Sequence, residues 1–127
     1  MKTYKKYYII PEIPEIVYQA LTTETTLKLW TGFEAEMQEK PDTEFSLWDG
    51  SICGKNISFE KNKKIVQEWF FGEQEEKSIV TLKLHEHKKG TSVELNHTNI
   101  PSEDFEAICE GWDETYFADL IDFYTGA

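Results

Sequence analysis

The last quarter of the sequence predicts one long amphipathic helix, and this helix constrains the fold more than any other segment. After Pro101, apolar residues recur at steps of three or four: Phe105, Cys109, Trp112, Tyr116, Leu120 and Phe123. Four more widen the same stripe: Ile108, Phe117, Ile121 and Tyr124. A face this apolar and aromatic must pack against a large surface. The strands that precede the helix are the only part of the chain able to supply one.

Those strands are indicated by alternation of apolar and polar residues between turn signals such as Asp49-Gly50. We predict strands over residues 3–10, 33–37, 44–48, 51–61, 64–71, 78–85 and 91–99. Two short helices are expected over 14–21, where Pro14 suits a first helical position, and over 23–30. The order predicts an α+β fold: a curved antiparallel sheet of about six to seven strands wraps the terminal helix, and the first strand lies at an edge.

Composition limits the classes of function. At 127 residues the chain is expected to form one domain, 1–127, with a core of its own. The net charge of −11 argues against binding nucleic acid or an anionic membrane, because both need a basic surface. Two cysteines make neither a disulfide framework nor a metal motif. With no signal peptide or membrane span in view, we expect a cytoplasmic monomer.

Short motifs follow one another in a recognisable order along nearly the whole chain. They lie at residues 13–22, 29–32, 45–50 with 52 and 54–56, 64–69, 90–97 with 100–101, and 111–112. In this order they resemble the activator of Hsp90 ATPase homologue family, in its C-terminal-domain form, within the START-like (SRPBCC) superfamily. The resemblance implies the helix-grip fold, also called Bet v 1-like, and a chaperone as partner. Eukaryotic Hsp90 activators add an N-terminal domain that makes much of the chaperone contact, whereas this sequence begins at the START-like domain.

A helix-grip fold can enclose an apolar cavity between its sheet and its terminal helix. Strand alternation also turns Ile65, Val80, Leu84 and Val93 inward. The candidate ligand-binding residues are Trp30, Phe45, Leu47, Gln67, Trp69, Leu82, Leu95, His97, Cys109, Trp112 and Tyr116. A lipid-like or aromatic small molecule would suit such a pocket. The alternative is that these bulky side chains fill the interior as an ordinary close-packed core.

His97 and Gln67 are the polar exceptions on the inward face. His97 could orient a ligand or act as a base; alternatively it is a core histidine bonded to Gln67, a tyrosine hydroxyl or the backbone. His85 and His87 belong to a hairpin and are expected to be exposed, without a metal. Cys109 is expected to behave as a small buried apolar side chain. We therefore predict no catalytic residue, no metal and no cofactor.

Three acidic clusters occur: 34, 36 and 39; 73, 75 and 76; 103, 104 and 106. The third suits the first turn of the long helix, where negative charge meets the helix dipole favourably. The other two are expected to be solvated surface, with binding of a basic partner as the alternative. Ser102 is the expected cap of the long helix. Three function classes follow: a non-enzymatic binder of an apolar small molecule, an Hsp90-type co-chaperone or stress-response interaction module, and a cyclase- or aromatase-like enzyme. The third lacks a second acid or base facing His97, so we expect a protein that is not an enzyme.

Overall fold

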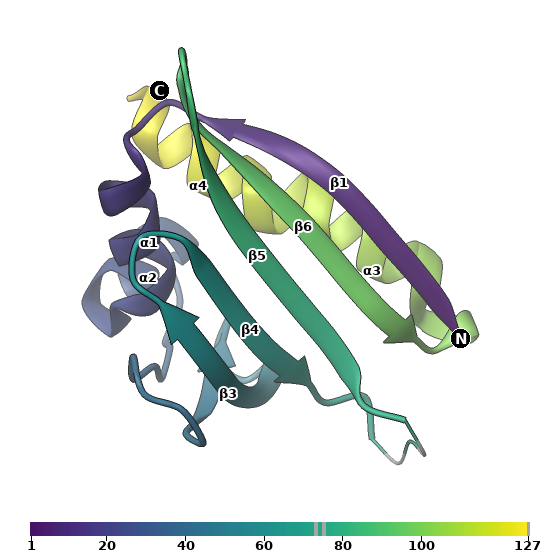
Figure 1. The fold of residues 1–127 in the computed structure, drawn as a ribbon. Helices are drawn as coiled ribbons and strands as arrows, with labels where there is room; N and C mark the ends of the chain where they lie inside the picture. The colour runs from purple at the N-terminus through teal and green to yellow at the C-terminus, as the bar shows by residue number, and fades with distance from the viewer. Residues whose placement is uncertain (73, 75, 127) are drawn as a thin grey trace.

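In the computed structural model, which describes residues 1–72, 74 and 76–126, the strands form one antiparallel sheet (Figure 1). Its order is β1-β6-β5-β4-β3-β2. The strands are β1 (Lys2–Ile10), β2 (Glu44–Leu47), β3 (Ile52–Glu60), β4 (Lys64–Trp69), β5 (Ser78–His87) and β6 (Gly90–Ile100). Strands β2 to β6 form a meander, and β1 pairs with β6 at the edge, as the sequence predicts. Glu73 and Glu75 of the second acidic cluster lie outside the described residues.

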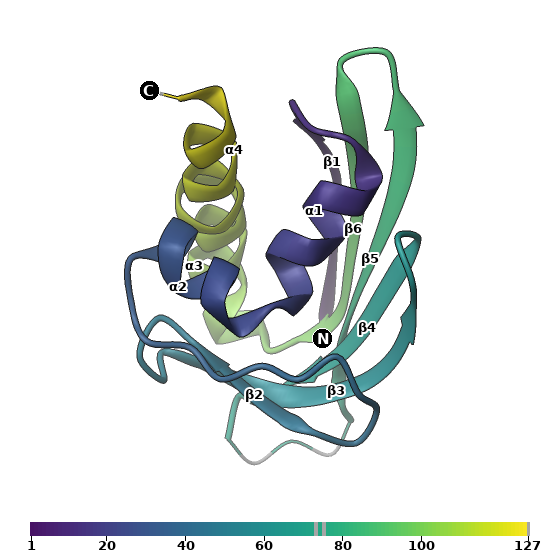
Figure 2. The ribbon, with the colours of Figure 1, turned by 90° about the vertical axis from the view of Figure 1, so that its left-hand side faces the viewer.

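The helices all cover the same, concave face of the sheet (Figure 2). They are α1 (Pro14–Thr22), α2 (Glu24–Thr31), α3 (Phe105–Gly111) and α4 (Phe117–Thr125). Pro14 opens α1, and Gly32 ends α2 with a left-handed φ of 77°. This arrangement is the predicted helix-grip fold. No helix among the described residues is long and apolar enough to cross a membrane.

The strand predicted over 33–37 is wrong, because this segment contributes only a single bridge between Glu36 and Ser46. Two of its backbone N–H groups are instead satisfied by side chains of α2. The hydroxyl of Thr31 accepts a hydrogen bond from the Phe33 N–H at 3.3 Å, and the carboxylate of Glu24 accepts one from the Met37 N–H at 3.0 Å. A segment paired with side chains in this way does not need a neighbouring strand.

The C-terminal helix is interrupted by a π turn over Trp112–Tyr116 that the periodicity did not reveal. A π turn holds one residue more than an α turn, so the buried face moves by one position. Phe117 and Leu120 are buried beyond it, whereas Phe123 is 42% exposed, contrary to the predicted stripe. Before the π turn the helix is also less buried than expected, because Phe105 and Cys109 are only half-buried.

The start of the helix differs from the prediction as well. Residues Ser102–Asp104 form one 3₁₀ turn before α3, and Ser102 makes no side-chain capping bond. The turn is closed by the Asp104 N–H, which donates to the Pro101 carbonyl at 3.0 Å. The backbone itself therefore satisfies part of the helix end that Ser102 was expected to cap.

Edge strand β1 is tied to the π turn through one carboxylate. Oδ1 of Asp113 accepts hydrogen bonds from the Tyr4 hydroxyl at 3.0 Å, the Lys6 ammonium at 2.9 Å and the Tyr8 hydroxyl at 2.5 Å. Burial alone would raise the pKa of Asp113, but these three donors outweigh it and lower that pKa. The Tyr8 ring also stacks on Phe117, with centroids 3.9 Å apart. The π turn is thus held against the sheet by a charged anchor.

Candidate functional site

A pocket of about 280 Å³ opens where the β2–β3 turn and the end of β4 meet α3 and the π turn. Its lining residues are Trp48, Ser51, Ile52, Trp69, Ala107, Ile108, Gly111, Trp112, Thr115 and Tyr116. Large aromatic rings form its inner wall, and the hydroxyl-bearing side chains in the lining are Ser51, Thr115 and Tyr116. The pocket lies between the sheet and the C-terminal helix, where the sequence predicted that a cavity could form.

The inner wall belongs to an aromatic cluster that contains all four tryptophans of the chain. Trp69 and Trp112 stack with their ring centroids 4.6 Å apart. Tyr116 packs edge-on against Trp30, with centroids at 5.3 Å, and lies 5.6 Å from Trp48. The offset and edge-on geometries are those that aromatic quadrupoles favour. The cluster therefore forms a rigid floor beneath the pocket.

His97 lies behind this floor and is fully buried. Its Nδ1 accepts a hydrogen bond from the Trp112 indole N–H at 3.1 Å, which places the ring proton on Nε2. Nε2 then donates to the Ser78 hydroxyl at 2.8 Å, and Ser78 donates to the Thr98 carbonyl at 3.2 Å. Burial lowers the pKa of His97 to about 4, so the ring is neutral near pH 7. The side-chain partners of His97 are therefore Trp112 and Ser78, and not Gln67 or a tyrosine hydroxyl as the sequence suggested.

Gln67 anchors a second buried chain of hydrogen bonds. Its Oε1 accepts from the Trp69 indole N–H at 3.1 Å, and its Nε2 donates to Asn56 Oδ1 at 3.0 Å. Asn56 in turn donates to the Gln38 carbonyl and to the Thr43 hydroxyl, both at 3.1 Å. No buried side-chain polar atom in the described part of the chain lacks a partner. Both polar chains therefore orient tryptophan rings, and neither leaves a free group facing the pocket.

The structure divides the eleven predicted ligand-binding residues into three groups. Trp69, Trp112 and Tyr116 line the pocket. Seven others are buried behind it as core: Trp30, Phe45, Leu47, Gln67, Leu82, Leu95 and His97. The last, Cys109, does not line the pocket, because α3 turns Ile108 and Gly111 toward it. Burial, followed by the charge of Asp113, raises the pKa of the Cys109 thiol.

Trp48 is the main lining residue that the sequence analysis missed. It follows β2 at the turn, has a left-handed φ of 50°, and its ring faces Trp30 and Tyr116. An aromatic residue directly before Asp49-Gly50 could have suggested a hairpin tip folded back on the helix. Ala107, Gly111 and Thr115 also line the pocket, but none of them belongs to the aromatic stripe that the periodicity singled out.

A wider, open depression of about 1000 Å³ lies at the other end of the sheet, between the start of α1, the β3–β4 turn and the β5–β6 hairpin. Both signs of charge line it, and Lys64 is paired with Glu60 at 3.1 Å. His85 and His87 are exposed there, as predicted, and His85 contacts Glu94 at 3.0 Å. Within the described residues, no group of three or more histidine, cysteine and acidic side chains could hold a metal.

Residues 13–123 match the family model described as Activator of Hsp90 ATPase homolog 1-like protein. The chain belongs to this family. A relative from Dictyostelium discoideum, the Activator of 90 kDa heat shock protein ATPase homolog, is 31% identical over 102 residues. That match covers 78% of this chain and 27% of the relative, so the chain spans about a quarter of its length. The family predicted from the sequence motifs is confirmed.

Solved structures of similar proteins agree with the fold. An HSP90 activator from Plasmodium falciparum is 28% identical, with a TM-score of 0.85 over 98% of this chain and 96% of that one. The Aha1 dimer from Colwellia psychrerythraea is 23% identical, with a TM-score of 0.80 over 96% and 95%. The second likeness concerns the fold alone. Together they place this member of the family among START-like helix-grip domains of the same size.

Proposed function

We propose that the chain is a non-enzymatic binding module that engages an Hsp90-type chaperone ATPase. The observation that carries the proposal is the match, over 98% of this chain and 96% of the other, to the P. falciparum HSP90 activator. A START-like domain of this size is therefore compatible with a protein of that kind.

The interior supports a binding role rather than a catalytic one. Both ring nitrogens of His97 are engaged, and burial keeps the ring neutral by lowering its pKa to about 4. A general base needs a free nitrogen within reach of its substrate. The pocket lining includes no carboxylate, histidine or lysine. A cyclase-like reaction would lack the acid and base that it requires.

The chaperone proposal is tested by titrating the protein into an Hsp90-type chaperone. We expect a saturable increase of the chaperone's ATPase rate and a matching binding isotherm by calorimetry. The proposal would be refuted if, at high protein concentration, the titration gave no heat of binding and the ATPase rate of the chaperone did not change.

A second candidate function is binding of a small planar apolar molecule, and the aromatic pocket is the observation that favours it. A volume of about 280 Å³ lies just below the usual range for ligand pockets, roughly 300–1000 Å³, so only a compact ligand would fit. Such a ligand would stack on the Trp69–Trp112 pair, and Trp48 would cover it from the turn.

Gly111 allows the two functions to be separated. A Cβ added there meets no neighbouring atom within 4 Å, so a larger side chain has open space at the pocket wall. In an NMR titration with flavonoid-like aromatics, a ligand should shift the Trp69 and Trp112 signals in the native protein but not in Gly111→Leu. Stimulation of the chaperone should survive this substitution. Shifts that persist in Gly111→Leu would place the ligand elsewhere.

We also propose that the protein acts as a cytoplasmic monomer. Both cysteines, Cys53 and Cys109, are free, which suits a reducing compartment. Sedimentation velocity over a range of concentrations tests the oligomeric state, and a stable dimer at low concentration would refute the monomer.

A further inference from the structure

Two breaks in the regular pattern bring large apolar side chains to the surface at one place. The left-handed turn at Gly32 ends α2 and is followed by Phe33, which is 56% exposed. The π turn displaces Phe123 of α4 from the buried face, leaving it 42% exposed. Leu29 on α2, at 64%, is the most exposed of the three. Exposed apolar side chains that gather in this way commonly mark an interaction site.

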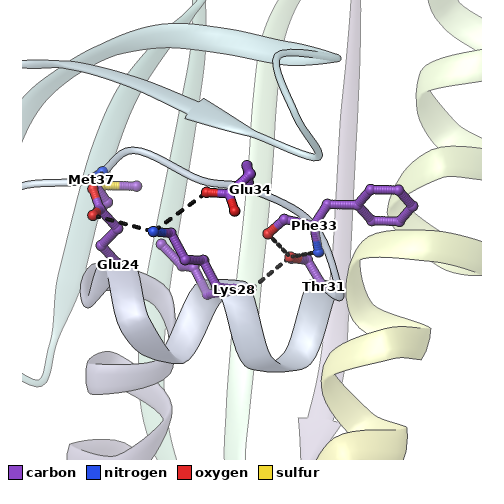
Figure 3. Close-up of polar contacts among 7 residues, drawn as sticks. Glu24, Lys28, Thr31, Phe33, Glu34 and Met37 are labelled. Carbon is purple, nitrogen blue, oxygen red and sulfur yellow. Dashed lines mark hydrogen bonds and ion pairs between the residues drawn. The ribbon is translucent and has the colours of Figure 1, made fainter.

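These side chains adjoin one another because α2 packs against α4. Leu29 and Phe123 line one shallow groove of about 340 Å³, with Gly32 among the other lining residues. Gly32 also lines the adjoining hollow that contains Phe33. In Figure 3 the ring of Phe33 points away from the polar contacts at the end of α2. The hollow of Phe33 thus adjoins the groove of Leu29 and Phe123 at Gly32.

The border of this surface is acidic. Asp119 and Asp122 line the same groove as Leu29 and Phe123. Neither aspartate takes part in an ion pair among the described residues. Burial and the neighbouring charge of Asp122 raise the pKa of Asp119, as expected for two carboxylates without a cation between them.

The lysine of α2, Lys28, does not neutralise this border. Lys28 lines the hollow of Phe33 and not the groove of the two aspartates, and its ammonium is already paired, 3.4 Å from Glu34 and 3.8 Å from Glu24 (Figure 3). The surface therefore combines exposed apolar side chains with uncompensated negative charge. A partner that complements it needs an apolar side chain and a cation beside it.

We propose that this surface, the α2–α4 patch formed by Leu29, Phe33, Asp119, Asp122 and Phe123, docks a segment of a partner protein in which an apolar side chain is flanked by lysine or arginine. The apolar side chain lies against Leu29 and Phe123, and the cation lies near Asp119 and Asp122. The long stem of lysine or arginine can cover apolar surface while its charge reaches the carboxylates. The patch would serve any partner with this chemistry, whether or not it is an Hsp90-type chaperone.

The probe is a short amphipathic peptide of leucine and lysine, titrated into the isotopically labelled protein. We expect saturable shifts at Leu29, Phe33 and Phe123, and no binding of the peptide in which glutamate replaces every lysine. Phe123→Ser should lower the affinity at least about tenfold, as the loss of a central apolar contact does. If that variant fails to fold, Phe33→Ser is the alternative, since its ring is the more exposed of the two.

Matched controls distinguish the patch from general attraction to an acidic protein. The double variant Glu106→Gln, Glu110→Gln removes two exposed charges from the same C-terminal helix. It should lower the affinity for the peptide less than the double variant Asp119→Asn, Asp122→Asn. Ile57→Ser removes an exposed apolar side chain from β3 and should leave the affinity unchanged. Equal losses in patch and control variants would overturn the proposal. The proposal would also be overturned if the protein formed a dimer that Phe123→Ser dissociates, because the patch would then bind a second copy of this chain.

Discussion

Replacing Trp112 by phenylalanine tests whether the buried polar chain behind the pocket stabilises the fold. Trp112 is 2% exposed, stacks on Trp69 and donates its indole N–H to Nδ1 of His97 at 3.1 Å. Phenylalanine keeps an aromatic ring at this position but has no donor. In Trp112→Phe the Nδ1 acceptor is therefore left buried without a partner.

Two losses determine the magnitude. An acceptor left unsatisfied in the interior costs about 1–3 kcal/mol. The smaller ring leaves a void, which costs roughly 1 kcal/mol more when part of the site collapses around it. We therefore expect the free energy of unfolding to fall by about 2–4 kcal/mol, which a domain of this size can lose and still fold.

Urea unfolding followed by circular dichroism measures this loss, and the slope against urea should stay the same. Phe70→Leu, at a ring that is 43% exposed, is the control and should change the stability by no more than about 0.5 kcal/mol. Combining Trp112→Phe with His97→Leu removes the orphaned acceptor, so the two losses should not add. A loss under about 0.5 kcal/mol, or strict additivity, would refute the role given to this hydrogen bond.

Further expectations concern pH, glycine and the anchor of the π turn. Burial lowers the pKa of His97 from 6.5 to about 4, so between these pH values the unfolded chain binds a proton that the folded protein does not. The free energy of unfolding should therefore fall by about 3 kcal/mol as the pH drops from 6.5 to about 4. His97→Gln should flatten this dependence of stability on pH. Gly54→Ala should lower the free energy of unfolding by about 1–3 kcal/mol, because a Cβ there would lie 2.1 Å from a backbone carbonyl oxygen. Gly111→Ala has open space around its Cβ and should raise that free energy by about 0.5–1 kcal/mol. Thermal unfolding measures both changes, and the opposite order would refute this account of the packing. Tyr8→Phe removes a hydrogen bond to the Asp113 carboxylate and should lower the unfolding free energy in urea by about 1–3 kcal/mol; an unchanged midpoint would mean that this anchor is dispensable.

Local patterns predicted most of the sheet because a strand's side chains alternate between its two faces whatever the strand pairs with. Ile65, Gln67, Trp69 and His97 are all buried, as the alternation required. The segment 33–37 failed for a related reason. Ala35 and Met37 are buried as the alternation required, but Phe33 is exposed. Side chains of α2 satisfy the N–H groups of Phe33 and Met37, and those contacts depend on the path of the chain.

The sequence by itself determined the family, the order of the elements and the inward faces of the strands, since these follow from motifs and from a period of two. Only the tertiary structure decided how the pocket is built. The π turn, the partners of His97 and the inward turn of Trp48 arise from contacts between residues far apart in the chain. The π turn also placed Phe123 on the surface instead of in the core. Helical periodicity assumes an uninterrupted α-helix, and one inserted residue is enough to rotate everything that follows.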